Sequence, residues 1–221
     1  MNKQQVIIIP VHNQLPYLIK AIKSVIRKTK EYELIIVDDG STDYNIREYL
    51  SSNEGIFTLL INETAQGFSA ACNKGIQYAI DNFDFNCLCL LNSDAEVVTE
   101  NWFDNVEEKF LTGDKIGVAS VMSDNAMAQT VKNIDKYLNE IEQKPTVYCN
   151  FVHGFCYFVS KELIETIGLF DESTFPHYGS EDDYSLKSIK AGFKNIIVGS
   201  VFVKHNNETS YTHAVRAKFI K

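Results

Sequence analysis

The sequence predicts an α/β fold in which helices flank a mostly parallel central sheet. Short apolar runs rich in β-branched residues, such as residues 6–9 and 34–37, alternate along the chain with segments of helical apolar spacing. Several of these runs end abruptly in polar or acidic residues. In open α/β sheets, ligands bind at the carboxyl edge, so we expect a binding site where these strands end.

Length and composition favour one folded domain over residues 1–221. With 45% hydrophobic and 23% charged residues, the chain has enough apolar material for one sizeable core. A formal charge of −8 argues against nucleic-acid binding and against a polybasic membrane face. No apolar run approaches the roughly 20 residues that span a bilayer, and no leader peptide is visible. The five cysteines form no paired framework, so we expect reduced core residues of a cytosolic protein.

The first part of the chain alternates strands and helices. Pro16 suits the first turn of its first helix, where a missing N–H is harmless. Gly67 and the small residues after it permit close approach to a ligand, or only tight packing against the sheet. The strands are expected over residues 6–9, 34–37, 56–61 and 87–91, and the helices over residues 15–29, 44–50 and 67–80.

The second part is less regular. An amphipathic helix is expected over residues 131–141, and strand character over residues 147–159 is interrupted at Gly154. The other helices are expected over residues 102–111, 161–167 and 181–191, and the other strands over residues 116–121, 196–198 and 201–203.

Polar side chains follow three of the expected parallel strands. Asn13 follows the first, Asp38 and Asp39 end the second, and Asp94 follows the fourth. Parallel strands bring these groups to one edge, facing a common crevice. The Asp-Asp-Gly sequence also occurs in solvated turns that merely cap a helix. Several ionised carboxylates share a crevice only when a cation offsets their repulsion.

The cation implied by this crevice is hard and divalent. Asp94 and His205 offer oxygen and imidazole ligands with no cysteine nearby, which suits Mn²⁺ or Mg²⁺ completed by phosphate and water. A lone histidine after a strand is more often a plain surface residue. The acidic cluster Glu181-Asp182-Asp183 opens a helix, where carboxylates are also favoured by the dipole alone.

Taken together, these segments resemble the family 2 glycosyltransferases with the GT-A fold, from Val6 to about Tyr211. Each matching segment is weak by itself, but seven in the right order are specific. They are Pro10-Val11-His12-Asn13, Asp38-Asp39-Gly40-Ser41-Thr42-Asp43, Gly67 to Gly75, Leu91-Asn92-Ser93-Asp94, Gly168-Leu169-Phe170-Asp171-Glu172, Glu181-Asp182-Asp183 and His205.

The resemblance implies a nucleotide-sugar-binding half over residues 1–98 and an acceptor-binding half over residues 99–221. It makes Asp182 the general base, with Asp183 as the alternative base and Glu181 as a neighbour that orients the loop. Asp94 and His205 would hold the metal on the diphosphate. The residues implied to bind the nucleotide sugar are Pro10, Val11, His12, Asn13, Asp38, Asp39, Gly67, Asn73, Asn92 and Ser93.

Two departures from the family pattern affect these roles. Asn92 stands where many relatives have the first carboxylate of an Asp-x-Asp metal motif, and Cys72 stands where many have an arginine. Both departures, with Ser210 shortly after His205, resemble the rhamnosyltransferase-like branch. The polar segment over residues 206–212 is expected to be a lid that orders over the diphosphate. The pattern in residues 214–221 does not distinguish a packed helix from the start of a truncated acceptor region.

The implied reaction is inverting transfer of a hexosyl or deoxyhexosyl group from a UDP- or dTDP-sugar. The acceptor would be a glycan, a lipid-linked glycan or a protein, in synthesis of bacterial cell-surface polysaccharide or glycan. The expected location is cytoplasmic, with peripheral attachment to the inner membrane face as a further possibility. One alternative is a nucleotidyltransferase acting on sugar phosphates, although residues 10–13 lack the glycine or lysine of a phosphate loop. The other is a non-catalytic sugar-binding module, which has no reason to keep both Asp94 and Asp182.

Overall fold

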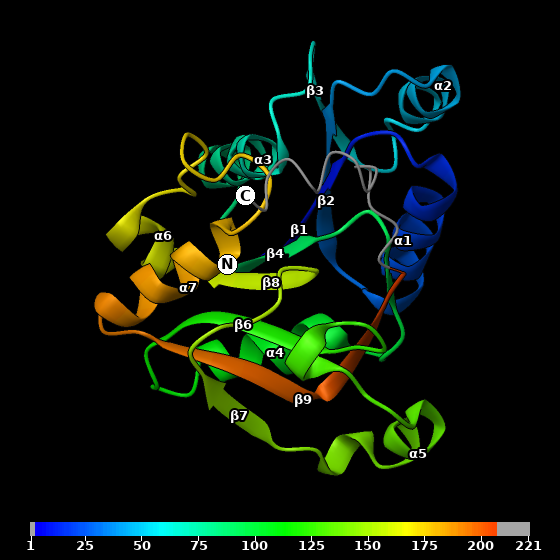
Figure 1. Cartoon of the computed structure of the whole chain (residues 1–221). Coiled ribbons are helices and arrows are strands. Elements are labelled where there is room, and N and C mark those ends of the chain that lie inside the picture. Colours follow the sequence, from blue (N-terminus) through cyan, green and yellow to red (C-terminus); the bar gives the residue numbers. More distant parts are fainter. Residues whose placement is uncertain (1–2, 207–221) are drawn as a thin grey trace.

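The computed structural model describes residues 3–206, and one nine-stranded sheet extends through them (Figure 1). The strand order is β3-β2-β1-β4-β8-β6-β9-β5, and β7 pairs with β9 beside this path. The strands are β1 (Gln5–Val11), β2 (Tyr32–Asp39), β3 (Thr58–Asn62), β4 (Cys87–Leu91), β5 (Ala95–Val97), β6 (Ile116–Met122), β7 (Thr146–Cys149), β8 (Cys156–Ser160) and β9 (Lys194–His205).

The sheet is mostly parallel. Pairing places β1, β2, β3, β4, β6 and β9 in one direction, whereas β5, β7 and β8 run the opposite way. The expectation of an α/β fold with a mostly parallel sheet is therefore confirmed. The register of β1 with β2 pairs Val11 with Asp38, so the polar ends of these strands share one edge.

Helices cover both faces of the sheet, with α1 and α2 on one side and α3, α6 and α7 on the other (Figure 1). Alternate residues along β1 feed two separate cores, because Ile7 and Ile9 face α1 whereas Val6 and Ile8 face α3. The helices are α1 (Leu15–Lys28), α2 (Tyr44–Ser52), α3 (Phe68–Asn82), α4 (Trp102–Phe110), α5 (Ile134–Asn139), α6 (Lys161–Ile167) and α7 (Ser180–Lys190), with short 3₁₀ turns at Met127–Gln129 and Ile141–Gln143.

The last strands differ from the expectation. Residues 196–198 and 201–203 belong to one strand, β9, because a bulge absorbs the residues between them: Val121 pairs with Val198 and the next residue, Met122, with Phe202. The sequence analysis also missed β5, which is only three residues long and pairs with the end of β9. Both details matter for the site, since they fix where the end of β9 lies.

The expected helix over residues 131–141 is also shorter than predicted. Its first residues are not helical, and the N–H of Val131 donates to the Ser123 carbonyl at 2.7 Å. Asn133 then caps α5, accepting from the Lys136 N–H at 3.0 Å, so the helix begins only at Ile134. Apolar periodicity does not reveal such a cap-defined start.

Four of the cysteines are buried, Cys149 is partly buried, and all five are free thiols in this structure. Among residues 3–206, no helix is both long and apolar enough to cross a bilayer. The expected lid beyond Asn206, Ser210 and the segment over residues 214–221 lie outside the described residues. The division into a donor half and an acceptor half stays a prediction.

Candidate active site

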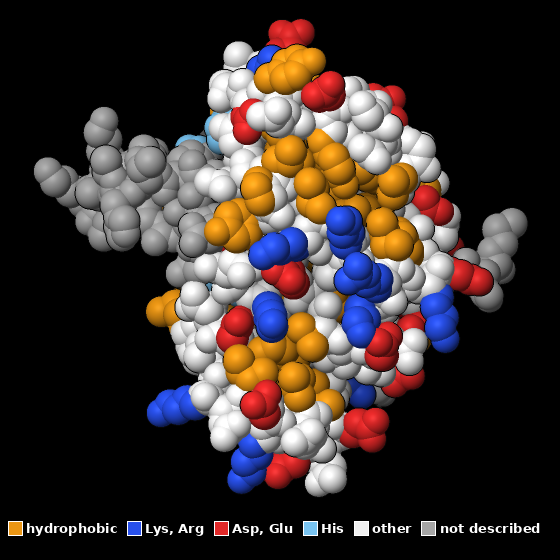
Figure 2. Space-filling view, turned by 90° about the vertical axis from the view of Figure 1, so that its right-hand side faces the viewer, with side chains coloured by type: hydrophobic (Ala, Val, Ile, Leu, Met, Phe, Trp, Pro, Cys, Tyr) orange, Lys and Arg blue, Asp and Glu red, His pale blue; other side chains and the backbone are white. Residues whose placement is uncertain are grey.

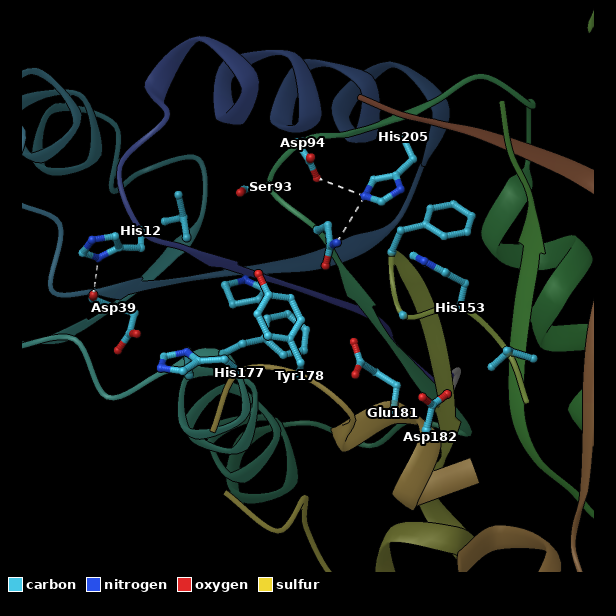
Figure 3. Close-up of a pocket in the computed structure, with 18 of the residues that line it drawn as sticks. His12, Asp39, Ser93, Asp94, His153, His177, Tyr178, Glu181, Asp182 and His205 are labelled. Atoms are coloured by element: carbon cyan, nitrogen blue, oxygen red, sulfur yellow. Dashed lines mark hydrogen bonds and ion pairs between the residues drawn. The ribbon is translucent and has the colours of Figure 1, made fainter. Parts of the chain in front are cut away.

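The carboxyl ends of β1, β2 and β4 border a cavity of about 350 Å³ (Figure 3). Its other walls come from the loop between β7 and β8 and from the start of α7, so it joins segments from both ends of the chain. Ten of the residues singled out from the sequence line it: Pro10, Val11, His12, Asp39, Asn92, Ser93, Asp94, Glu181, Asp182 and His205.

Two of the remaining residues hold the turn after β2. The Asn13 side-chain oxygen accepts from the backbone N–H groups of Thr42 and Asp43 at 2.9 and 3.0 Å. The Asp38 carboxylate accepts from the Ser41 N–H at 2.9 Å. These bonds hold the acidic turn against the end of β1. Neither Asn13 nor Asp38 lines the cavity.

Three further residues lie outside the cavity walls, namely Gly67, Asn73 and Asp183. The Asn73 side chain exchanges two hydrogen bonds with the backbone of Phe170, both 2.9 Å, and so ties α3 to the loop before α7. Asp183 forms an ion pair with Lys187 one turn along α7, at 2.6 Å. The roles assigned to these residues in donor binding and catalysis stay predictions.

Asp39 is 3% exposed and organises the edge of the cavity. Its carboxylate accepts from the Asn62 side-chain amide and from the backbone N–H groups of Gln66 and Gly67, each at 2.8 Å. Its carbonyl accepts from Nδ1 of His12, also at 2.8 Å. Asp39 therefore connects β2 with the loop that leads into α3 and with the segment after β1.

Asp39→Ala is expected to lower the free energy of unfolding by about 3 kcal/mol, because it leaves the Gln66 and Gly67 N–H groups without an acceptor. Urea denaturation would measure the change. The matched control is Asp43→Ala, which removes an exposed cap of α2 and should cost about 1 kcal/mol. A loss no larger for Asp39→Ala than for the control would contradict this role.

Asp94 and His205 meet at the far end of the sheet edge. β5 pairs Ala95 with His205, which brings the neighbouring Asp94 carboxylate to 3.5 Å from the imidazole Nε2. The two side chains are 9% and 5% exposed. Nδ1 of His205 lies 2.9 Å from the Asn125 carbonyl, which can only accept, so Nδ1 carries a proton. This leaves Nε2, on the side of the ring that faces Asp94, as the nitrogen that could bind a metal.

This pair fits a hard divalent cation. Within residues 3–206, no group of three or more His, Cys, Asp or Glu side chains is placed to hold a metal. The protein would thus supply one carboxylate and one imidazole, and the other positions suit phosphate oxygens and water. The Asn92 side-chain nitrogen lies 3.5 Å from Nε2 of His205. An amide therefore lies beside the pair, at the position of the first carboxylate of the Asp-x-Asp motif.

Two carboxylates at the start of α7 line the cavity across from Asp94 (Figure 3). Burial raises the pKa of Glu181, and the neighbouring Asp182 acts in the same direction. Gly154 leaves room for Glu181, because a Cβ at this position would overlap the Glu181 carboxylate. Asp182 is exposed at the cavity, where a second substrate can reach it from solvent.

The raised pKa of Glu181 predicts a pH dependence of stability. A carboxyl group whose pKa is higher in the folded state contributes stability at low pH and loses it as pH rises above the unfolded value of about 4.5. The wild type should therefore lose stability relative to Glu181→Gln between about pH 4 and pH 7. Urea denaturation across this range would measure it, with the exposed Glu165→Gln as control. Parallel pH curves for wild type and Glu181→Gln would refute the prediction.

The cavity also contains residues that the sequence analysis did not single out for the site. They come mainly from irregular segments whose folding depends on long-range contacts. His177, for example, packs against Gly67, where a Cβ would come within 3.1 Å of its ring. In the sequence, the only indication of these residues was a histidine in each of two loops. A single sequence does not show whether such a histidine lines a cavity or lies on the surface. These residues are Phe68, Ala71, Met127, Val152, His153, Gly154, Phe155, His177 and Tyr178.

Comparison with known proteins agrees with this architecture. The family model described as Glycosyl transferase family 2 matches residues 6–168. An uncharacterized glycosyltransferase of Rickettsia felis is 26% identical over 198 residues, which cover 87% of this chain and 31% of that protein. The UDP-Glc:alpha-D-GlcNAc-diphosphoundecaprenol beta-1,3-glucosyltransferase of Escherichia coli is 33% identical over 89 residues, covering 40% of this chain and 34% of that protein.

Among solved structures, the fold is similar to that of GalNAc-T7 crystallised with UDP, GalNAc and Mn²⁺. The TM-score is 0.73 at 19% sequence identity, with 92% of this chain and 44% of the other covered. This similarity shows a shared GT-A fold. The matched part covers less than half the length of each of these three proteins.

Proposed function

Because the chain belongs to glycosyl transferase family 2, we propose that it is an inverting enzyme that moves a hexosyl or deoxyhexosyl group from a nucleoside diphosphate sugar to an acceptor hydroxyl. One observation carries the proposal. A single cavity joins the Asp94–His205 pair at one end of the sheet edge with the exposed carboxylate of Asp182 on α7. Inverting transfer needs these two functions on opposite sides of the reacting carbon.

In this reaction Asp182 takes the proton of the acceptor hydroxyl while the hydroxyl oxygen attacks the anomeric carbon. The bond from that carbon to the diphosphate oxygen breaks, and its electron pair leaves with the diphosphate. Asp94 and Nε2 of His205 would hold Mn²⁺ or Mg²⁺, which when bound stabilises the charge on the departing diphosphate. Asp39 and His12 hold the opposite edge of the cavity, where the nucleoside would bind.

The donor is proposed to be a UDP- or dTDP-sugar, and the rhamnosyltransferase-like branch is proposed from Asn92, Cys72 and Ser210. GalNAc-T7 was crystallised with UDP and Mn²⁺, which supports a nucleotide sugar and a divalent cation for this chain. The Escherichia coli relative acts on a diphosphoundecaprenol-linked sugar, which supports a glycan or lipid-linked glycan acceptor in bacterial cell-surface polysaccharide synthesis. Such an acceptor suits a cytoplasmic enzyme that works at the inner membrane face.

The alternatives are less well supported. A nucleotidyltransferase is disfavoured by the family match over residues 6–168. A non-catalytic sugar-binding module would have no need for both a metal pair and a carboxylate in the same cavity.

The test is a panel of UDP-, dTDP- and GDP-sugars with and without Mn²⁺, scored by thermal shift and by slow hydrolysis of the donor. We expect one donor to raise the melting temperature only with Mn²⁺ and to release a nucleoside diphosphate. Binding without any turnover would favour the sugar-binding module. Release of pyrophosphate from a nucleoside triphosphate and a sugar phosphate would favour the nucleotidyltransferase.

A further inference from the structure

We infer that His153 determines donor specificity, through a hydrogen bond between its imidazole and a hydroxyl group of the donor sugar. This inference rests on the proposed function and adds to it a residue that recognises the donor sugar. None of the family motifs in the sequence includes His153, and it lies in the loop between β7 and β8.

The backbone of His153 is held rigidly. Its N–H donates to the Gln129 side-chain oxygen at 2.6 Å, and its carbonyl accepts from the Ser120 hydroxyl at 3.1 Å. Gln129 and Ser120 are buried and bonded to each other at 2.9 Å. A loop fixed at both its N–H and its carbonyl presents the side chain in a defined direction, which a specificity residue requires.

The imidazole of His153 lies between the two functional ends of the cavity (Figure 3). Its ring is 5.6 Å from the His205 ring and 5.8 Å from the Phe155 ring, measured between centroids. The Asp182 carboxylate also acts on it electrostatically. In the proposed reaction the diphosphate lies at His205 and the acceptor hydroxyl at Asp182. The sugar must bridge them, so His153 borders the sugar.

Among the described residues, the polar atoms of this ring have no hydrogen-bond partner. Nδ1 is buried and forms no hydrogen bond with any residue between 3 and 206, and no bond to Nε2 is formed there either. In contrast, His12 and His205 each use Nδ1 to reach a backbone carbonyl. A neutral imidazole offers one donor and one acceptor nitrogen. Unlike Nδ1, Nε2 is not among the enclosed unpaired atoms, so it is the nitrogen that a sugar hydroxyl in the cavity can reach.

Packing alone does not explain a histidine at this position. The ring contacts to Phe155 and His205 are of a kind that phenylalanine would make equally well. This gives a matched pair of variants. His153→Phe keeps a ring and removes both nitrogens, whereas His153→Gln removes the ring and keeps a donor and an acceptor.

The experiment compares two affinities in Mn²⁺ by calorimetry. The probes are UDP-glucose, UDP-galactose, UDP-GlcNAc, GDP-mannose and dTDP-rhamnose, with UDP, GDP and dTDP as their sugar-free references. For whichever sugar the wild type binds, His153→Phe should lower the ratio of nucleotide-sugar affinity to nucleotide affinity about tenfold. His153→Gln should restore part of this ratio. His177→Phe, at the end beside Gly67, should change both affinities equally.

If His153→Phe has the same ratio of nucleotide-sugar affinity to nucleotide affinity as the wild type, the inference is overturned and the proposed function stays intact. Failure of the wild type to bind any of these nucleotides would overturn the proposed function and the inference with it. If His153→Phe does not fold, His153→Met takes its place, since it has the length of glutamine without its polar atoms. A ratio for His153→Met as high as for His153→Gln would again overturn the inference.

Discussion

Asp182→Asn is expected to lower the rate of sugar transfer by about 10² to 10⁴-fold. The substitution keeps the shape and hydrogen bonding of the side chain but removes the group that accepts the proton of the acceptor. Affinity for the donor should barely change, because Asp182 lies on α7, across the cavity from the Asp94 carboxylate that would face the diphosphate. The measurements are the transfer rate and the dissociation constant of the donor with Mn²⁺.

The neighbouring carboxylates provide the matched controls. Asp183→Asn should retain most of the transfer activity, because Asp183 does not line the cavity and pairs with Lys187. Glu181→Gln should have an intermediate effect, since Glu181 lines the cavity beside Asp182 but is more buried. Near-normal transfer by Asp182→Asn, together with a large loss in either control, would show that Asp182 is not the general base and that the neighbouring carboxylate takes this role.

The parts of the fold that could be predicted are those whose sequence pattern reflects local burial. β1, β2 and β4 are buried on both faces, so they appear as continuous apolar runs that stop at polar residues. The position of β8 as an antiparallel strand between β4 and β6 has no such signal, because pairing partners are distant in sequence. β5 is too short to form a pattern, and the bulge in β9 resembles a break between two strands.

The candidate site divides in the same way. Asp39 and Asp94 could be identified because each lies at or just after the end of a buried strand, and His12 through the family resemblance of residues 10–13. His153 and His177 could not, because their positions depend on loops that fold back over the sheet. For His153, the contacts that decide this are the hydrogen bonds to Gln129 and Ser120, and both join segments that are separate in sequence. One sequence shows the presence of these loops but not which of their residues reach the cavity.

The second large effect is expected at the metal pair. His205→Phe keeps a ring to stack on Phe155, whose centroid lies 5.1 Å away at an interplanar angle of 23°, and removes the Nε2 ligand. Asp94→Asn keeps the shape of the side chain and removes its charge. Because the protein supplies only this carboxylate and this imidazole among its described residues, either change should lower Mn²⁺-dependent affinity for a nucleoside diphosphate by about 10²-fold.

The control for this prediction is the same titration in EDTA. Without the cation, the wild type, His205→Phe and Asp94→Asn should bind UDP with equal and weak affinity, because the contacts around Asp39 remain intact in all three. Transfer should fall with binding in both variants, which distinguishes them from Asp182→Asn, where only transfer falls. Undiminished donor binding and turnover by the wild type in EDTA would show that Asp94 and His205 are not a metal site. The pair at 3.5 Å would then be a buried carboxylate–imidazole contact that only holds β5 to the end of β9.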